Sequence, residues 1–362
     1  MWYLIMTNKQ YSIAVIPGDG IGNEVVPEAL KVLEAVGRRF DISYKFDHFD
    51  WSCERYQKLG SMMPEDGLAQ IRNHDSILLG AVGYPGVADH VSLWGLLIPI
   101  RREFHQYVNL RPVRLFDGID SPLKGRKPGD IDMMIVRENN EGEYSDIGGR
   151  VFEGTNNEFV QQQSIFSRVG THRIMRYAFD LARMRTRKHV TSATKSNGII
   201  HSMPYWDEQF ALIGAEYEDV KTAQFHIDIM TAHFVRNPDW FDVVVASNLF
   251  GDILSDLGPA VTGTIAIAPG GNINPEKEYP SMFEPVHGSA PDIHGQLISN
   301  PIGEIWSAGM MLDHLGEHEA ASAIEVAIET VLRESDVKTP DMGGKANTIE
   351  LGDAIASIAG GL

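Results

Sequence analysis

Residues 243–256 constrain the fold most strongly, because they predict a buried strand that leads into a helix. Residues 243–245 form a β-branched apolar run without polar alternation, which is typical of a strand covered on both faces. The Asn-Leu-Phe-Gly segment at 248–251 is expected to form a turn, with the helix beginning after it. A strand followed directly by a helix is the repeating unit of α/β proteins.

Two acidic residues of this stretch are candidate metal ligands. Asp252 and Asp256 are four residues apart, so on a helix their side chains point to the same face. Neighbouring carboxylates repel each other unless a cation lies between them, and Mg²⁺ and Mn²⁺ prefer such oxygen ligands. The alternative is that Asp252 complements the helix dipole while Asp256 is solvated. Asp228, further back in the chain, adds a third carboxylate.

The rest of the chain alternates strands and helices. Strands are predicted at 12–16, 76–79, 132–136 and 189–193, and helices after the first strand through residue 36 and at 171–183. Residues 302–332 are strongly helical and apolar, so the end of the chain is expected to pack on the first domain. Because 362 residues exceed the usual size of one domain, we expect two domains that share a cleft.

Two segments depart from this alternation. Residues 139–163 are polar and glycine-rich and become β-like at 159–165, which indicates a projecting arm of the kind that often joins subunits. Residues 265–301 are dominated by glycine and proline, so we expect a long functional loop region there rather than regular structure.

Composition narrows the possible partners and the compartment. The formal net charge of −18 argues against nucleic acid or an anionic membrane as a partner, since both require a basic surface. The single cysteine, Cys53, forms no internal disulfide, which favours a reducing compartment. Residues 1–6 lack the basic leader and length of a signal peptide, and Met6 is an alternative start. No apolar run approaches the roughly 20 residues of a membrane span, so we expect a cytoplasmic protein.

A glycine-rich turn follows each of the first two predicted strands, at 17–22 and 80–86. Loops at the carboxyl ends of strands are where open α/β sheets bind ligands. The first turn is similar to a dinucleotide fingerprint, but its glycines are spaced G-x-G-x-G rather than G-x-G-x-x-G. An ordinary Rossmann fold is therefore not favoured.

Arginines, a tyrosine and a lysine are candidate active-site residues. Arg101, Arg102, Arg111 and Arg137 lie where guanidinium groups can clamp carboxylates, although each has a surface ion pair as the alternative, which we expect for Arg102. Two further residues are able to transfer protons, Tyr144 and Lys195. Their alternatives are a paired tyrosine hydroxyl and a solvated lysine.

The acidic residue at the end of the 284–292 loop is a candidate cofactor contact. A carboxylate beside an adenosine ribose would bond its hydroxyl and repel a 2′-phosphate, and Asp292 is suited to that role. The alternative is that Asp292 forms an Asx-turn.

Taken together, these segments resemble the β-decarboxylating dehydrogenase family, which includes isopropylmalate, isocitrate, D-malate and tartrate dehydrogenases. The resemblance spans nearly the entire chain. Its motifs lie at 16–22, 109–112, 137–139, 195–197, 248–256 and 284–292. The stretches at 92–95 and 204–208 are most similar to the tartrate and D-malate branch.

The resemblance implies an open α/β fold of the isopropylmalate/isocitrate dehydrogenase kind, which has two domains and is not a Rossmann fold. Residues 1–106 and 263–362 would form a large domain on the cofactor side. Residues 107–262 would form a small domain with metal ligands, dimer interface and projecting arm. The resemblance also implies a homodimer in which Lys195 and Asp228 enter the partner's active site.

The resemblance further implies a role for each candidate residue. Asp252 and Asp256 of one subunit and Asp228 of the other would hold Mn²⁺ or Mg²⁺, with K⁺ as an optional further ion. Lys195 would accept the proton of the 2-hydroxyl as a hydride leaves for NAD, and Tyr144 would protonate the enolate that remains after loss of CO₂. The substrate carboxylates would be bound by Arg101, Arg111 and Arg137. The adenosine of NAD would be held by His287, Gly288, Ser289, Ala290, Asp292 and Asn300, with Asp292 favouring NAD over NADP.

Substrate choice is expected to depend on the helix before Arg101. Isopropylmalate members usually carry Glu-Thr-Gly-Leu-Leu there, whereas residues 93–97 read Leu-Trp-Gly-Leu-Leu. The indole of Trp94, together with Leu97, should shrink the pocket and favour small diacids. The resemblance thus implies oxidation of tartrate to oxaloglycolate, with decarboxylation of D-malate to pyruvate and of meso-tartrate to D-glycerate. The alternatives are a dedicated D-malate dehydrogenase, a 3-isopropylmalate dehydrogenase, and a non-catalytic regulatory subunit.

Overall fold

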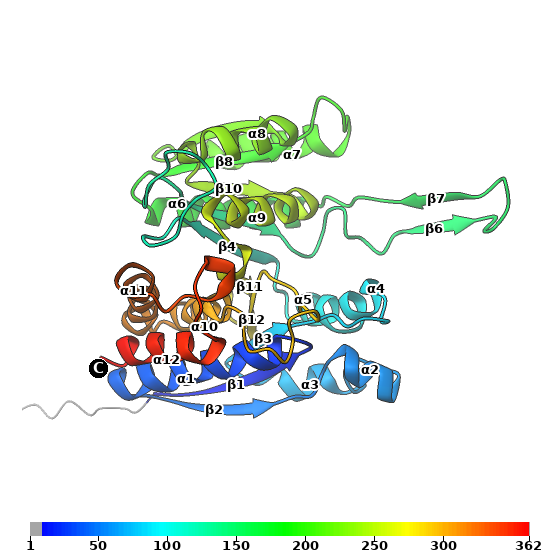
Figure 1. The fold of residues 1–362 in the computed structure, drawn as a ribbon. Helices are drawn as coiled ribbons and strands as arrows, with labels where there is room; N and C mark the ends of the chain where they lie inside the picture. The colour runs from blue at the N-terminus through cyan, green and yellow to red at the C-terminus, as the bar shows by residue number, and fades with distance from the viewer. Residues whose placement is uncertain (1–8, 362) are drawn as a thin grey trace, which may run out of the picture. The chain divides into compact units, whose positions relative to one another are not determined.

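The computed structural model describes residues 9–361, which form two units (Figure 1). The terminal unit contains residues 9–104, 116–120 and 263–361, and the central unit contains residues 105–115 and 121–262. The expected boundaries are 106/107 and 262/263, whereas residues 105 and 106 group with the central unit and 116–120 group with the terminal unit. The reason is packing: the Phe116 ring lies 5.0 Å from that of Trp306, and Lys338 donates to the Gly118 carbonyl at 2.6 Å. The apolar segment 1–6, considered above as a possible leader, lies outside the described residues.

The terminal unit is built on a mixed sheet with strand order β2-β1-β3-β12-β11. Neighbouring strands are parallel except for the antiparallel pair β11 and β12. The strands are β1 (Lys9–Gly18), β2 (Ile42–His48), β3 (Ser76–Ala81), β11 (Pro269–Ile273) and β12 (Ser281–Pro285).

The expectation that 265–301 lacks regular structure is wrong, because β11 and β12 lie within it and are buried along their whole length. Gly271 of β11 allows close packing against β12. A Cβ at Gly271 would lie 3.0 Å from the Phe283 ring on the neighbouring strand, so the absence of a side chain leaves room for the ring. After β12 the chain remains irregular up to residue 301, apart from turns.

One group of helices in the terminal unit consists of α1 (Gly22–Phe40), α10 (Ile302–Leu315), α11 (His318–Glu334) and α12 (Thr348–Ala359), which pack on one another. The expected packing of the chain end on this domain is confirmed by the contact of α12 with α1. The helical segment predicted at 302–332 is interrupted, since Gly316, at φ 93°, ends α10. A left-handed backbone favours glycine because other residues carry a Cβ that is strained there.

Shorter helices in the terminal unit cover the other face of its sheet. They are α2 (Cys53–Leu59), α3 (Gly67–Ile71), α4 (Asp89–Ser92), the π-helical turn η1 (Leu93–Leu97) and α5 (Ile98–Glu103). Ala14 and Ile16 of β1 share a buried core with Leu96 and Ile100 from this group. Side chains alternate along a strand, so Ile13 and Val15, which are also fully buried, point to the opposite face.

The central unit has the strand order β4-β5-β10-β8-β9, in which only β4 and β5 are antiparallel. The strands are β4 (Val108–Arg114), β5 (Asp132–Glu138), β8 (His189–Thr194), β9 (Lys221–His226) and β10 (Val243–Ala246). Its helices are α6 (Arg168–Met184), α7 (Ser202–Gly214), α8 (Ile227–Arg236) and α9 (Asn248–Thr262). The strands predicted from apolar runs are confirmed.

The predicted turn at 248–251 is wrong, because α9 already begins at Asn248. The cause is a long-range partner. The Glu143 carboxylate accepts hydrogen bonds from the Leu249 backbone N–H at 3.0 Å and from the Ser247 hydroxyl at 2.9 Å. A carboxylate at a helix N-terminus satisfies an otherwise unpaired N–H and complements the helix dipole.

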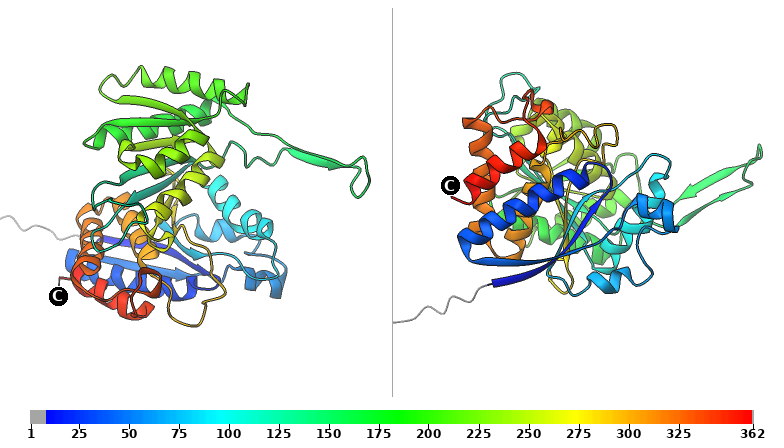
Figure 2. Two further views of the ribbon diagram at one scale, coloured as in Figure 1. Left: turned by 45° about the horizontal axis from the view of Figure 1, so that its top comes forward. Right: turned by 60° about the horizontal axis from the view of Figure 1, so that its bottom comes forward.

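The expected projecting arm is present. Strands β6 (Gly148–Val151) and β7 (Phe159–Gln162) pair antiparallel and extend away from the sheet of the central unit (Figures 1 and 2). The arm exposes apolar side chains, among them Phe152, Phe159 and Val160. Among residues 9–361, no helix has the length and apolar character that crossing a membrane requires.

Candidate active site

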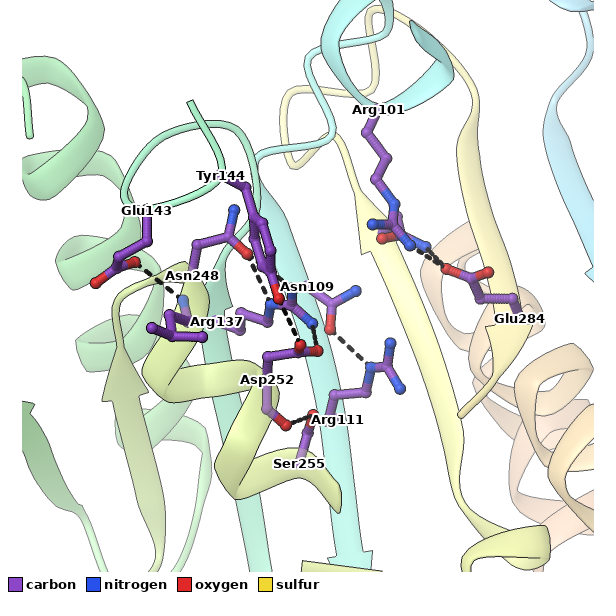
Figure 3. A network of polar contacts seen from close by, with 12 residues as sticks. Arg101, Asn109, Arg111, Arg137, Glu143, Tyr144, Asn248, Asp252, Ser255 and Glu284 are labelled. Carbon is purple, nitrogen blue, oxygen red and sulfur yellow. Dashed lines mark hydrogen bonds and ion pairs between the residues drawn. The ribbon is translucent and has the colours of Figure 1, made fainter. Parts of the chain in front are cut away.

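A polar cluster lies where β5 ends and α9 begins (Figure 3). It consists of Arg137, Tyr144, Asn248 and Asp252, and we call it the Arg137 cluster. Arg137 donates to the Asn248 side-chain oxygen from Nε at 3.0 Å and from Nη2 at 2.7 Å, and its Nη1 bonds Asp252. Gly251 makes this approach possible, because a Cβ there would lie 2.5 Å from the Arg137 Cβ. The structure thus brings together a predicted carboxylate clamp and a predicted metal ligand.

Tyr144 belongs to the same cluster. Its hydroxyl donates to Asp252 Oδ2 at 2.8 Å, and the Arg137 guanidinium carbon lies 5.6 Å from the centre of its ring. Burial, and then the hydrogen bond to Asp252, raise the pKa of Tyr144 to about 12. The hydroxyl is therefore protonated at neutral pH and able to act as a proton donor.

Asp256 lies one turn further along α9. Burial raises the pKa of Asp256, and the negative charge of Asp252 raises it further, while the positive charges of Arg111 and Arg137 oppose the shift. Arg111, on β4, is itself buried and donates from Nε to the Asn109 side-chain oxygen at 2.7 Å. Two carboxylates one helical turn apart, with the charge of Asp252 opposing ionisation of Asp256, form a donor set that fits a hard divalent cation.

Lys195 and Asp228 form a separate pair. Lys195 follows β8 and Asp228 lies in the first turn of α8, and the Lys195 ammonium donates to Asp228 at 2.8 Å. This hydrogen bond is the main reason why the pKa of Asp228 is lowered. Within residues 9–361, no three acidic, histidine or cysteine side chains converge to form a metal site. The topology explains why Asp228 is separate from Asp252, since β8 lies between the strands that precede them, β9 and β10.

In the terminal unit, Arg101 is held by an acidic partner. Its Nη2 donates to Glu284 Oε1 at 2.7 Å, and both side chains are about nine-tenths buried (Figure 3). The Asn272 amide donates to the same oxygen at 2.7 Å. Trp94 and Leu97, the residues predicted to shape the substrate pocket, lie seven and four positions earlier on the π-helical turn η1. Arg102, for which a surface ion pair was expected, has its guanidinium carbon 4.9 Å from the centre of the Trp94 ring.

The predicted cofactor loop packs on the first glycine-rich turn. The Ser289 carbonyl accepts a hydrogen bond from the Ile21 backbone N–H at 2.9 Å, and a Cβ at Gly20, which has φ 54°, would lie 2.0 Å from that carbonyl oxygen. Burial lowers the pKa of His287, so its imidazole is neutral at neutral pH. Its Nε2 is buried without a hydrogen-bond partner, which fits a nitrogen that forms a hydrogen bond with a bound ligand.

The remaining predicted adenosine contacts differ in exposure. Ala290 has φ 39°, a strained left-handed backbone that the surrounding loop holds in place. Asp292 is exposed. Asn300 is buried, and its side chain donates to Asp341 at 3.1 Å and accepts from the Ile302 backbone N–H at 3.0 Å. Asn300 therefore also orders the start of α10.

The turn at 17–22 acts as a structural junction. The Asp19 carboxylate accepts hydrogen bonds from the backbone N–H groups of Cys53 at 2.9 Å, Glu54 at 3.1 Å and Gly83 at 3.1 Å. These hydrogen bonds join parts of the chain to one another and do not support the interpretation of the turn as a dinucleotide fingerprint. Sequence reasoning missed Asp19 as a positioning residue, and it missed Glu143 and Asn248. For Glu143 no local signal exists, because its partners are more than 100 positions away.

Comparison with known proteins adds an independent finding. Residues 12–355 match the family described as isocitrate/isopropylmalate dehydrogenase. The chain is 57% identical over 357 residues to D-malate dehydrogenase [decarboxylating] of Escherichia coli (strain K12), covering 97% of this chain and 99% of that protein. It is 55% identical over 359 residues to tartrate dehydrogenase/decarboxylase of Pseudomonas putida, covering 97% and 98%.

The solved structures give the same result for the fold. A crystal structure of isocitrate dehydrogenase from Methylococcus capsulatus aligns with a TM-score of 0.87 at 33% identity, covering 96% of this chain and 99% of that one. The expected open-sheet fold of the isopropylmalate/isocitrate dehydrogenase kind is confirmed.

Proposed function

The chain belongs to the isocitrate/isopropylmalate dehydrogenase family, and we propose that it is an NAD-dependent, divalent-metal-dependent dehydrogenase of small 2-hydroxydiacids. Its reactions are oxidation of tartrate to oxaloglycolate, oxidative decarboxylation of D-malate to pyruvate, and decarboxylation of meso-tartrate to D-glycerate. The Arg137 cluster carries the proposal, because a clamp, a proton donor and a metal ligand contact one another there. The names of the two relatives described above support the choice of substrates.

Dehydrogenases of this family generally use NAD(P) and a divalent metal. Here Asp252 and Asp256, with Asp228 of a second subunit, would hold Mn²⁺ or Mg²⁺. The ion would polarise the 2-hydroxyl and the adjacent carboxylate, and NAD would accept the hydride from C2. Burial, and then the negative charge of Asp252, raise the pKa of Asp256, and a bound cation would favour the ionised form of both carboxylates, which supports the metal assignment.

Lys195 is the base of the proposed reaction. As a neutral amine it accepts the proton of the 2-hydroxyl while the hydride leaves C2, which produces a 2-oxo acid and the Lys195 ammonium. Asp228 bonds the Lys195 ammonium at 2.8 Å and keeps it oriented. The lowered pKa of Asp228 means that it remains an ionised acceptor at neutral pH.

Tyr144 is the acid. Loss of CO₂ from the β-carboxylate leaves its electron pair on C3, and the Tyr144 hydroxyl supplies a proton to that carbon. A tyrosine with a pKa of about 12 retains its proton at neutral pH, and Asp252 orients the hydroxyl. Tartrate oxidised without loss of CO₂ does not need this step.

Three arginines bind the substrate carboxylates, namely Arg101, Arg111 and Arg137. Each is at least nine-tenths buried and held by a polar partner, so little side-chain entropy is lost on binding. Trp94 and Leu97 limit the space beside the substrate's C3.

The nucleotide contacts are proposed in the 287–300 loop region. The unpartnered His287 Nε2 and the backbone of Gly288, Ser289 and Ala290 would face the adenosine, with Asn300 beside them. The exposed Asp292 carboxylate would bond the ribose 2′-hydroxyl and repel a 2′-phosphate, which favours NAD over NADP.

We further propose that the enzyme is a homodimer in which each chain completes the site of the other. The exposed apolar side chains of the β6–β7 arm support a subunit contact. The separation of Asp228 from Asp252 within one chain supports a shared metal site.

Steady-state rates with purified protein test the proposal. NADH formation would be followed with L-tartrate, meso-tartrate, D-malate and 3-isopropylmalate, each with Mn²⁺ and with Mg²⁺, and meso-tartrate decarboxylation would be followed by glycerate release. We expect turnover of tartrate and D-malate and little of 3-isopropylmalate. Turnover of 3-isopropylmalate alone would contradict the substrate class, and no turnover at all would favour a regulatory subunit.

A further inference from the structure

The run from α4 through η1 to α5 places an arginine over the tryptophan predicted to shape the substrate pocket. The Arg102 guanidinium carbon lies 4.9 Å from the centre of the Trp94 ring, and both side chains are partly buried. A planar guanidinium over an indole face restricts the ring to one orientation and is attracted by its π electrons.

The π-helical turn produces this alignment. In a regular α-helix, positions 94 and 102 would differ in direction by about 80°, because each residue adds about 100°. The extra residue accommodated by a π turn removes roughly one such step, so the two side chains lie within about 20° of each other. Long helical side chains also point back towards the N-terminus, which directs Arg102 over Trp94.

The backbone beneath Trp94 is fixed by its neighbours. Leu96 and Ile100 are fully buried in the core that also contains Met62. A Cβ at Gly95 would lie 2.8 Å from Met62 Cγ, so glycine lets the turn approach that core closely. With the backbone fixed, rotation of the Trp94 side chain is the main conformational freedom at this position, and the contact with Arg102 restricts that rotation.

We propose that Arg102 is a positioning residue, which holds the Trp94 indole as a wall against substrates with a bulky substituent at C3. The inference rests on the proposed function and deepens it, because it names the residue that sets selectivity for small diacids. Arg101, one position earlier, has a different task, since Glu284 holds it by a buried ion pair.

The selectivity ratio tests this role. It is kcat/KM for D-malate divided by kcat/KM for 3-isopropylmalate. Pocket differences on the scale of a methylene change such ratios by 10–200-fold, and we expect Arg102→Met to lower the ratio by about 10-fold. Arg102→Lys keeps the positive charge but removes the planar guanidinium group, and it should lower the ratio almost as much. A wild-type ratio in Arg102→Met would overturn the inference.

Two controls separate positioning from other effects. Arg72→Met removes a comparable stack, in which the guanidinium carbon lies 4.4 Å from the Tyr279 ring centre, and should leave the ratio unchanged. In a Trp94→Ala background, Arg102→Met should have no further effect on the ratio. A full additional effect in that background would show that Arg102 does not act through Trp94, and would overturn the inference.

Tryptophan fluorescence provides a readout that needs no substrate. Arg102→Met should change the emission of the wild-type protein but not that of Trp94→Phe, because the other tryptophans are not affected. Equal changes in both would contradict the stack. If the wild-type enzyme oxidises no diacid while the fluorescence result holds, the proposed function fails but the positioning of Trp94 by Arg102 does not.

Discussion

The Arg137 cluster and the Lys195–Asp228 pair lie in the same unit but differ in how completely their charges are enclosed. The Arg137 side chain is 6% exposed and that of Asp252 is 41% exposed, and the guanidinium bonds both Asn248 and Asp252. The Lys195 and Asp228 side chains are 29% and 67% exposed and bond each other. The first group is thus ordered within one chain before any ligand binds. The second remains open to groups from outside, as a pair that completes a partner's site would be.

Lys195→Met tests the role of the exposed pair, and we expect it to cause the largest loss of activity. Turnover of D-malate should fall by about 10³-fold, because general-base catalysis typically contributes 10²–10⁴-fold, while NAD binding should stay near normal. Rates and calorimetric NAD titration measure the two effects. The matched control is Lys188→Met, which removes another exposed lysine–aspartate pair and should change neither. More than a tenth of the wild-type rate in Lys195→Met would refute its role as base.

Mixing two inactive variants tests whether the Lys195–Asp228 pair of one chain completes the active site of another chain. If sites are shared, Lys195→Met and Asp252→Asn chains should form hybrids with one intact site each. Random mixing then restores about a quarter of the wild-type activity, because half of the dimers are hybrids and half of their sites are intact. The mixture should be unfolded and refolded together, and hybrid formation checked by mass. Hybrids without activity would show that each chain builds its own site.

Asp292→Ala should have a smaller effect, confined to nucleotide choice. Removing one hydrogen bond to the ribose and one repulsion of a 2′-phosphate should narrow the preference for NAD over NADP by about 10-fold or more. The ratio of kcat/KM for the two nucleotides measures this change. Asp313→Ala, at an exposed position on α10, serves as a control for the loss of one surface charge. An unchanged ratio in Asp292→Ala would count against the ribose assignment.

The smallest effect on activity is expected at a buried carboxyl group without a hydrogen-bond partner, where a substitution should change stability instead. Glu304 on α10 is fully buried, neither of its oxygens has a hydrogen bond, and burial raises its pKa well above the ordinary value. The unfolded chain releases this proton near pH 4.5 while the folded chain keeps it, so stability falls as pH rises from 4.5 towards the folded pKa.

Glu304→Met should therefore raise the free energy of unfolding at neutral pH by about 1–3 kcal/mol and remove this part of the pH dependence. Urea denaturation at several pH values measures both. Glu28 is also buried but bonds Lys31 at 2.6 Å, so Glu28→Met should be destabilising instead. Destabilisation of Glu304→Met to the same degree would show that Glu304 has a favourable partner.

Local sequence was sufficient for much of the fold and for the choice of most candidate site residues. The segments at 132–136, 189–193 and 243–245 form strands, and each contains β-branched residues, which fit a buried pleated surface. The i, i+4 spacing of Asp252 and Asp256 was readable because helical periodicity is a local property. The ordered motifs likewise indicate the family whose model matches residues 12–355.

Tertiary structure alone decided the features that depend on distant partners. The Glu143 carboxylate stabilises the start of α9 at Asn248. The Phe283 ring packs on Gly271, in the glycine-rich segment 265–301 that was expected to be irregular. The stack of Arg102 on Trp94 depends on a π-helical turn packed over Met62. Such contacts join residues far apart in the chain, and their free energies depend on burial and geometry, which sequence periodicity does not encode.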